Sequence, residues 1–156
     1  MCLMTYIVKA QEKVSIAVLQ DVRLATLGDD KGNDSFTLNL IARIKMQGNQ
    51  SKIGYLIIYP EWEYANLKQV YNRYSANVGY TLNKLPISNL EASLIGGIGM
   101  IARESESSSS FNVTGELAYK LNAWFKILLN AQIVQRSDID KWLCSGFAGL
   151  EITVFK

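Results

Sequence analysis

The sequence predicts an all-β fold, a meander of eight antiparallel strands that closes into an up-and-down barrel. Apolar and polar residues alternate with a period of two from Val14 to the end of the chain, as they do along half-buried strands. The alternation restarts after clusters of Gly, Asn, Asp, Ser or Pro, and no segment has a convincing helical period. Because the segments are even in number and joined consecutively, closure into a barrel would remove the exposed edges of the sheet.

Four predicted strands lie in the N-terminal half of the chain. Their alternating stretches span residues 14–24, 36–46, 52–64 and 74–82. The third stretch is the least regular, because Leu56–Tyr59 is apolar at every position and Pro60 follows directly. Since proline cannot donate to a strand ladder, a bulge or a sheet edge is expected at Pro60.

The other four predicted strands span residues 90–102, 111–121, 123–133 and 144–154. The serine-rich stretch ESESSSS at residues 104–110 predicts a solvated loop between the fifth and sixth strands. The sixth and seventh strands are separated by so few residues that a tight turn is expected at Leu121–Asn122. The stretch RSDIDK, residues 136–141, separates the seventh strand from the last.

The composition excludes several classes of function. A chain of 156 residues suits one domain, and 16 basic against 14 acidic residues leave a net charge of +2, too small to indicate a nucleic-acid partner. The absence of histidine excludes Ser-His-Asp and Cys-His mechanisms and histidine-ligated zinc. Cys2 and Cys144 form neither a thiolate metal site nor a disulfide framework. We therefore expect no metal, no cofactor and no enzymatic activity.

The first ten residues, MCLMTYIVKA, differ from the rest and are predicted to be the remnant of a secretory signal peptide. Residues 11–156 would then form a single β-barrel domain. The short apolar stretch ending in Val8-Lys9-Ala10 resembles the hydrophobic region and cleavage site of such a peptide, although the usual basic segment before it is missing. An ordinary N-terminal strand is the alternative.

Alternation alone leaves open which face of the barrel points inward. In a soluble lipocalin-like barrel the apolar positions fill the core, whereas in a membrane barrel they face lipid around a polar lumen. Three observations favour the membrane version: charges fall on the polar positions, the strands of about ten or more residues match a bilayer, and aromatic residues gather near segment ends. The predicted fold class is therefore an eight-stranded antiparallel up-and-down transmembrane β-barrel.

In the membrane version the charged polar positions point into the lumen. An eight-stranded barrel is just wide enough for side chains to fill, and an unpaired charge inside it would be costly. We therefore expect the lumenal charges to pair with one another and plug the barrel, which is a structural role. The predicted members of this network are Arg23, Arg43, Lys45, Arg73, Glu91, Arg103, Glu116, Lys120, Lys126 and Glu151.

On these features the sequence resembles the eight-stranded outer-membrane β-barrels of the OmpA and OmpX type, from about Val14 to Phe155. The last segment, GFAGLEITVF, looks like the aromatic-ended strand that such proteins present to the barrel assembly machinery, except that Lys156 follows Phe155. The resemblance implies residence in the bacterial outer membrane, in contact with the bilayer and lipopolysaccharide, with the N-terminus in the periplasm. The extracellular loops would be Gly28–Asp34, Ala65–Val70, Arg103–Ser110 and Arg136–Lys141, and the periplasmic turns Gln47–Ser51, Lys84–Asn89 and Leu121–Asn122.

Two functions from different classes remain open. The first is a structural or surface-interaction protein, active in adhesion or envelope integrity, whose extracellular loops contact lipopolysaccharide, a partner protein or another surface. The second is a soluble eight-stranded barrel that binds a small apolar ligand in its core. The direction in which the apolar positions point distinguishes the two.

Overall fold

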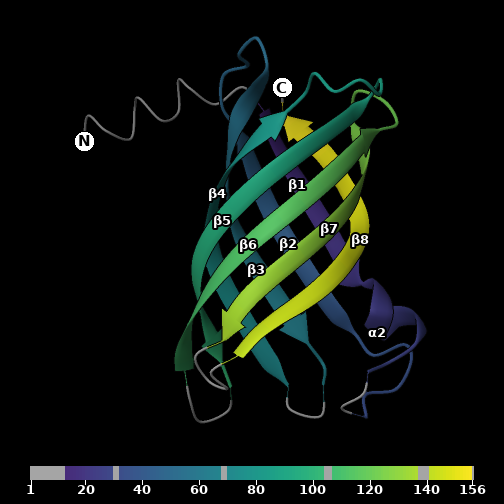
Figure 1. Ribbon diagram of the computed structural model, residues 1–156, viewed down its shortest axis with the longest axis vertical. Helices are drawn as coiled ribbons and strands as arrows, with labels where there is room; N and C mark the ends of the chain where they lie inside the picture. Colours follow the sequence, from purple (N-terminus) through teal and green to yellow (C-terminus); the bar gives the residue numbers. More distant parts are fainter. Residues whose placement is uncertain (1–12, 30–31, 68–69, 104–106, 137–140, 156) are drawn as a thin grey trace.

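The chain forms a closed barrel of eight antiparallel strands and one short helix (Figure 1). The computed structural model describes residues 13–29, 32–67, 70–103, 107–136 and 141–155. Its elements are β1 (Lys13–Asp21), α2 (Val22–Thr26), β2 (Asn39–Gln47), β3 (Gly54–Ala65), β4 (Tyr71–Leu82), β5 (Leu90–Ala102), β6 (Ser107–Lys120), β7 (Phe125–Arg136) and β8 (Lys141–Phe155). Each strand pairs with the next and β8 pairs with β1, so the predicted up-and-down topology is confirmed.

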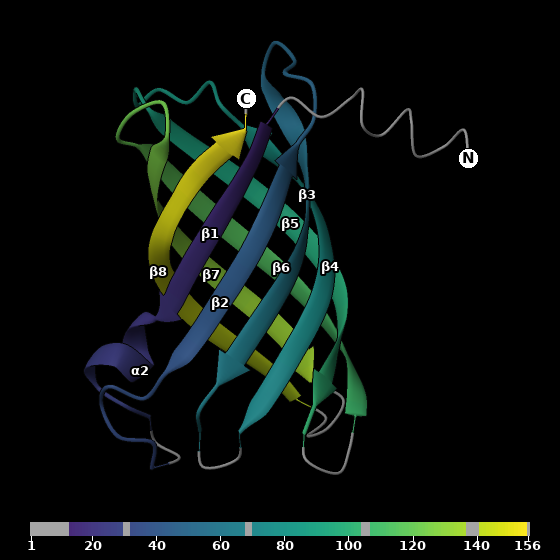
Figure 2. The ribbon, with the colours of Figure 1, turned by 180° about the vertical axis from the view of Figure 1, so that it is seen from behind.

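The two ends of the barrel carry different connections (Figures 1 and 2). The terminal end is where β1 begins and β8 ends, and it holds the turns β2–β3, β4–β5 and β6–β7. The loop end holds the four remaining connections, the first of which, β1–β2, contains α2. The β6–β7 turn is as tight as predicted, because Asn122 Oδ1 accepts hydrogen bonds from the backbone N–H groups of Trp124, at 2.8 Å, and Phe125, at 2.9 Å.

The apolar positions of the strands point outward and the polar positions point inward. Leu94 and Ile98 on β5 are 68% and 63% exposed, whereas Arg43 on β2 and Arg73 on β4 are each 1% exposed. The same alternation of exposed and buried residues runs along every strand. A lipocalin-like core requires the reverse arrangement, so the soluble alternative is wrong for this barrel.

Among the described residues, the interior also contains three clusters of buried apolar side chains, the largest of which includes residues of β1. The side chains that form this largest cluster are Ala17, Leu19, Ile41, Ala118, Leu128 and Phe147. Two of its members come from β1, whose inward positions are Ser15, Ala17 and Leu19 before Asp21. The apolar cluster explains why β1 supplies no basic or acidic group to the middle of the lumen.

Strand β3 runs through Pro60 without the predicted bulge or edge. Its pairing with β4 is unbroken, with Pro60 opposite Ala76. On the other side, β2 and β3 keep one register from Arg43 opposite Glu61 to Met46 opposite Ile58, with no ladder partners assigned between these two pairs. Proline lacks the N–H that would donate to β2, so the ladder is interrupted locally while the register is preserved.

The chain leaves the first strand earlier than the alternation predicts. Strand β1 ends at Asp21, whose carboxylate accepts a hydrogen bond of 3.0 Å from the backbone N–H of Leu24 and so caps α2. Arg23 therefore lies exposed on a helix and not in the lumen, which corrects the predicted position of this residue. Aspartate is a strong helix N-cap, and the cap competes successfully with continued strand pairing.

The serine run also differs from its prediction as a loop. Ser107–Ser110 form the first residues of β6 and pair with Gly99–Ala102 of β5. Strand pairing uses backbone groups, so polar side chains do not prevent it where a neighbouring strand is available. Ser107 and Ser109 are exposed and Ser110 is buried, so the run alternates as a strand does and its polar composition does not mark the absence of one.

The predicted signal-peptide remnant, residues 1–10, lies outside the described residues and stays a prediction. Cys2 belongs to the same segment, while Cys144 is an exposed free thiol on β8. Within the described ranges, no helix is long and apolar enough to span a membrane.

Candidate functional site

The lumen contains a continuous chain of ion pairs in which acidic and basic side chains alternate. At its loop end, Arg73 joins Glu63, at 2.7 Å, to Glu61, at 2.5 Å. Glu61 also binds Arg43, which in turn binds Glu116 at 2.9 Å. The side chains of these five residues are at most 5% exposed, so this part of the series of ion pairs is removed from solvent. We call these residues the sealed half of the ion-pair chain.

The ion-pair chain continues toward the terminal end through lysines. Lys45 joins Glu116, at 2.5 Å, to Glu151, at 2.7 Å. Lys126 then joins Glu151, at 3.2 Å, to Glu91, at 3.0 Å, and Lys120 binds the other oxygen of Glu91 at 2.8 Å. Lys120 is 40% exposed, because it lies at the rim of the barrel. We call Lys45, Glu151, Lys126, Glu91 and Lys120 the open half.

Some of these pairs join neighbouring strands and others cross the lumen. Glu61 lies opposite Arg43 in the β2–β3 ladder, and Lys126 lies opposite Glu151 in the β7–β8 ladder. Arg43 on β2 reaches Glu116 on β6, so this contact bridges the interior. The crossing contact places fixed charges across the lumen between β2 and β6.

Amide and hydroxyl side chains form hydrogen bonds with the charged groups of the sealed half. Arg73 donates to Asn112, at 3.3 Å, and to Gln132, at 3.0 Å, while Gln132 donates to Glu61 at 3.2 Å. Asn112 donates to Asn77 at 2.9 Å. Because buried charges are tolerated when their remaining hydrogen-bonding groups are satisfied, these amides are part of the same network.

A glycine on β5 makes room for this amide pair. A Cβ atom placed on Gly97 would lie 2.0 Å from Asn77 Oδ1 and 2.6 Å from Asn112 Oδ1. Any larger residue at position 97 would displace Asn112, which accepts a hydrogen bond from Arg73, and its partner Asn77. In contrast, a Cβ atom on Gly115, which faces outward from β6, would meet nothing within 4 Å.

Two aromatic rings line the network on the β2–β4 side. The guanidinium of Arg43 lies 5.1 Å from the centre of the Tyr59 ring, within the range of a cation–π contact. Tyr71 donates its hydroxyl to Glu63 at 2.7 Å, and the guanidinium of Arg136 lies 4.5 Å from the Tyr71 ring. The aromatic rings therefore fill space in the lumen and also interact with the charged groups, which aliphatic side chains of similar size could not do.

The structure brings together eight of the ten residues predicted to form the lumenal network. They are Arg43, Lys45, Arg73, Glu91, Glu116, Lys120, Lys126 and Glu151. Arg23 is exposed on α2, and half-buried Arg103 follows the end of β5 outside the ion-pair chain. Both lie beyond the strands at the loop end, where strand alternation no longer determines direction.

Sequence reasoning missed Glu61 and Glu63. Both residues point into the lumen from β3, in the same alternating set as Tyr55, Ile57 and Tyr59. The apolar stretch before Pro60 concealed this alternation. Counting back in steps of two from Glu63 would have revealed it, because the register continues through the proline.

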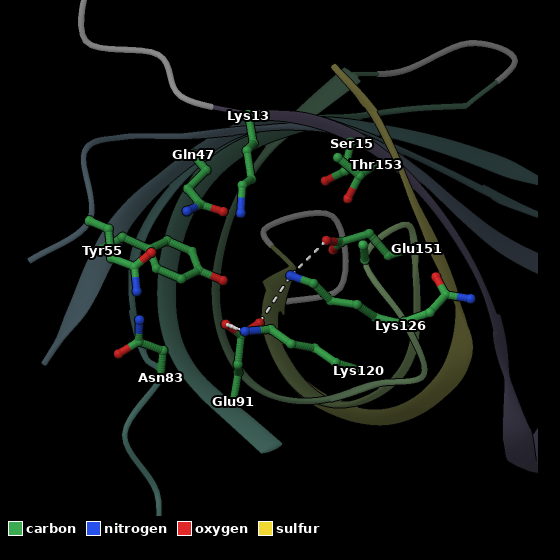
Figure 3. A pocket seen from close by; sticks show the side chains of 13 residues that line it. Lys13, Ser15, Gln47, Tyr55, Asn83, Glu91, Lys120, Lys126, Glu151 and Thr153 are labelled. Carbon is green, nitrogen blue, oxygen red and sulfur yellow. Dashed lines mark hydrogen bonds and ion pairs between the residues drawn. The ribbon is translucent and has the colours of Figure 1, made fainter. Parts of the chain in front are cut away.

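The open half borders a cavity at the terminal end (Figure 3). The cavity has a volume of about 240 Å³ and is lined by Lys13, Gln47 and Tyr55 together with the ion-paired Lys126 and Glu151. A second cavity of about 20 Å³ shares Tyr55, Lys126 and Glu151 and lies against Lys45 and Glu116. The lumen is therefore open to solvent at the terminal end and filled by side chains farther in.

The arrangement supplies charge pairing. No group of side chains among the described residues could hold a metal ion. The acidic side chains of the ion-pair chain all bind basic partners, which leaves them occupied as hydrogen-bond acceptors. The chemistry visible in the lumen is mutual neutralisation of fixed charges.

Comparisons with known proteins identify the fold. No protein family and no curated protein sequence matches the chain. The outer membrane protein Ail of Yersinia pestis, solved in a phospholipid bilayer nanodisc, is 12% identical with a TM-score of 0.59, over 92% of this chain and 100% of that chain. Neisserial surface protein A is 10% identical with a TM-score of 0.55, over 92% and 95% of the two chains.

A designed protein shares the architecture too. A de novo transmembrane β-barrel is 11% identical with a TM-score of 0.54, over 92% of this chain and 97% of that chain. At such low identities the likeness concerns the fold alone. The fold is that of the eight-stranded transmembrane β-barrels, which confirms the predicted fold class.

Proposed function

We propose that this protein is a small β-barrel of the bacterial outer membrane, with a structural or surface-interaction role through the connections at its loop end. The observation that carries the proposal is the inverted distribution of side chains. Charged groups fill the lumen, and large apolar residues such as Ile44, Val78 and Leu94 are exposed around the wall. Such a surface is stable against lipid and would aggregate in water.

Membrane residence is tested first, by gel mobility of the protein folded in detergent micelles. An unheated sample that migrates differently from a boiled one, with a β-rich circular dichroism spectrum, is expected. Recovery from cells in the outer-membrane fraction would locate it. A monodisperse monomer that stays soluble in buffer without detergent would refute the proposal.

The proposed role of the lumenal charges is structural, and we expect no pore. The sealed half fills the lumen with paired side chains, and Arg43 and Glu116 join opposite sides of the barrel. Planar bilayers containing the folded protein should therefore show no conductance above background. Stable unitary conductance would overturn the structural role and indicate a channel.

The proposed orientation places the terminal end in the periplasm and the loop end outside the cell. The start of β1 and the end of β8 lie at the same end of the barrel, and therefore on the same side of the membrane. An epitope inserted between Gly32 and Asn33 should bind antibody on intact cells, while the same epitope between Gly48 and Asn49 should bind only after permeabilisation. The opposite result would reverse the orientation.

Adhesion and envelope integrity are the two forms of the proposed role. The candidate partners are lipopolysaccharide and a surface partner at the loop end, with the barrel assembly machinery engaging β8 during insertion. We expect no nucleic-acid partner and no enzymatic activity. Deleting the gene should change detergent sensitivity if the role is integrity, or attachment to surfaces if it is adhesion; a deletion strain unchanged in both would refute both forms.

A further inference from the structure

The segment between β1 and β2, residues 22–38, exposes large apolar side chains beyond the barrel wall. Phe36 is 89% exposed and Leu27 is 83% exposed, the highest values for large hydrophobic residues in the described part of the chain. Val22 and Leu38 are also exposed, at 44% and 41%. Exposed apolar groups of this size in one short segment indicate a surface that is covered when the protein is in place.

Hydrogen bonds hold this segment in a defined conformation. The Gln20 side chain donates to the carbonyl of Thr37, at 3.1 Å, and accepts from the backbone N–H of Asn39, at 3.3 Å. Asp29 accepts from both the backbone and the side chain of Asn33, at 3.0 and 2.8 Å. Hydrogen bonds thus fix the backbone next to Phe36 and the Asp29–Asn33 turn.

The backbone at Phe36 supports the same interpretation. Its φ is 66°, in the left-handed region that bulky residues rarely adopt. Unfavourable backbone conformations of this kind are concentrated at functional positions, where the surrounding contacts maintain them. Phe36 occupies this conformation although glycine or asparagine would fit the backbone better.

The segment lies beside the lipid-facing wall. Helix α2 is anchored by Leu24, which is 3% exposed, and both views show it projecting sideways near β1 and β8 (Figures 1 and 2). Val22 lines a hollow of about 570 Å³ on the outside of the barrel, together with the outward-facing Leu117, Leu129 and Gly146. The exposed side of α2 is thus continuous with the surface that meets lipid.

We propose that residues 22–29 and 32–38 form an interfacial anchor whose apolar side chains, led by Leu27 and Phe36, enter the lipid leaflet beside the barrel. Aromatic and aliphatic side chains on a short amphipathic segment bind membranes in this way, with basic residues near the headgroups. Arg23 is exposed on α2, where its guanidinium can contact lipid phosphates. This inference rests on the membrane residence proposed above, not on the surface-interaction role.

Spin-label accessibility tests the anchor directly. In a Cys2→Ser, Cys144→Ser background, a nitroxide is attached at Ser35→Cys, next to Phe36, and at Asn49→Cys, an exposed position in the β2–β3 turn, as the matched control. The barrel is folded into vesicles of phosphatidylcholine and phosphatidylglycerol. The label at position 35 should favour collision with oxygen, which concentrates in lipid, whereas the control label should favour a water-soluble nickel complex.

A second variant separates lipid contact from crowding by the protein. Replacing Leu27 and Phe36 by serine should return the label at position 35 to high nickel accessibility, with little effect on folding because both side chains are exposed. Nickel accessibility at position 35 equal to the control in the unsubstituted segment would overturn the anchor and favour a protein partner. Heat-modifiable migration of the same samples shows whether membrane insertion itself has failed.

Discussion

The two halves of the ion-pair chain use the same alternation of charges in different surroundings. In the sealed half, Glu61 lies between two guanidinium groups, and the side chains of Glu61 and Arg43 are 0% exposed. In the open half, Lys126 and Lys120 share Glu91 beside a cavity of about 240 Å³. A charge that loses its partner in the sealed half has no access to water, whereas one in the open half can be hydrated.

This difference indicates which ion pairs contribute most to the stability of the barrel. Arginine offers a planar fork that can bind a carboxylate and neighbouring amides together, as Arg73 does with Glu63 and Gln132. Lysine is a flexible, strongly hydrated point charge and suits a rim open to solvent. We therefore expect the cost of removing one partner to fall from the sealed half to the open half.

The largest effect is expected from Glu61→Gln, which removes the carboxylate between Arg43 and Arg73. Arg43 would keep Glu116 and Arg73 would keep Glu63, but the sealed half would carry one uncompensated positive charge. Breaking a buried pair in this way destabilises proteins by about 3–5 kcal/mol. Urea titration of the barrel folded in phosphatidylcholine vesicles, followed by gel mobility, measures the free energy of unfolding.

A double variant sharpens this prediction. Glu61→Gln combined with Arg43→Gln should cost less than the sum of the two single changes, because each single change leaves one uncompensated charge in the buried network and the double change leaves none. Additive effects would show that Glu61 and Arg43 do not interact in the folded barrel.

The next largest effect is expected from Gly97→Ala. Its Cβ atom would overlap the Asn77–Asn112 pair beside Arg73, and overpacking of this kind costs about 1–3 kcal/mol. Gly115→Ala is the matched control, since its Cβ atom meets nothing within 4 Å and should change stability by less than about 0.5 kcal/mol. Equal urea midpoints for the two variants would contradict the close packing at Gly97.

In the open half, Lys126→Met should destabilise the barrel by about 1–2 kcal/mol. Glu151 would keep Lys45 and Glu91 would keep Lys120, and water in the adjoining cavity could solvate the freed oxygens. The urea titration used for Glu61→Gln gives the comparison. A loss as large as that of Glu61→Gln would mean that the open half is as dry as the sealed half.

The smallest effect is expected from Lys120→Gln at the rim. Its side chain is 40% exposed, and ion pairs that remain in contact with solvent contribute less than about 1 kcal/mol. The small difference from the unsubstituted barrel should shrink further in high salt, because ions screen exposed charges. A larger loss, unchanged by salt, would place Lys120 in the sealed part of the network.

The sequence allowed the fold class and much of the lumen to be predicted. Alternation with a period of two assigns every residue of a strand to one of two faces, so the amino-acid order alone places Arg43, Lys45, Glu116 and Glu151 on the polar faces of their strands. Glu63 escaped because the apolar stretch before Pro60 hid the alternation, although the strand itself keeps its register.

The predictions failed where a helix cap or pairing with a neighbouring strand determined the structure in place of the alternation. Asp21 ends β1 by capping α2, which places Arg23 outside the lumen. Ser107–Ser110 join β6 because β5 offers them backbone partners. Neither outcome can be inferred from periodicity, since a helix cap and an available neighbouring strand depend on geometry at the end of the barrel.

By itself the sequence determined that the chain forms long strands with one apolar and one polar face, because side chains alternate across a strand whatever its neighbours are. Only the tertiary structure decided which charges meet. Arg43 and Glu116 are separated by 73 positions and come together only because barrel closure and strand register bring β2 and β6 across one lumen. The exposure of Phe36 was likewise decided by the local backbone and its hydrogen bonds, such as that from Gln20 to Thr37, not by its place in an alternating pattern.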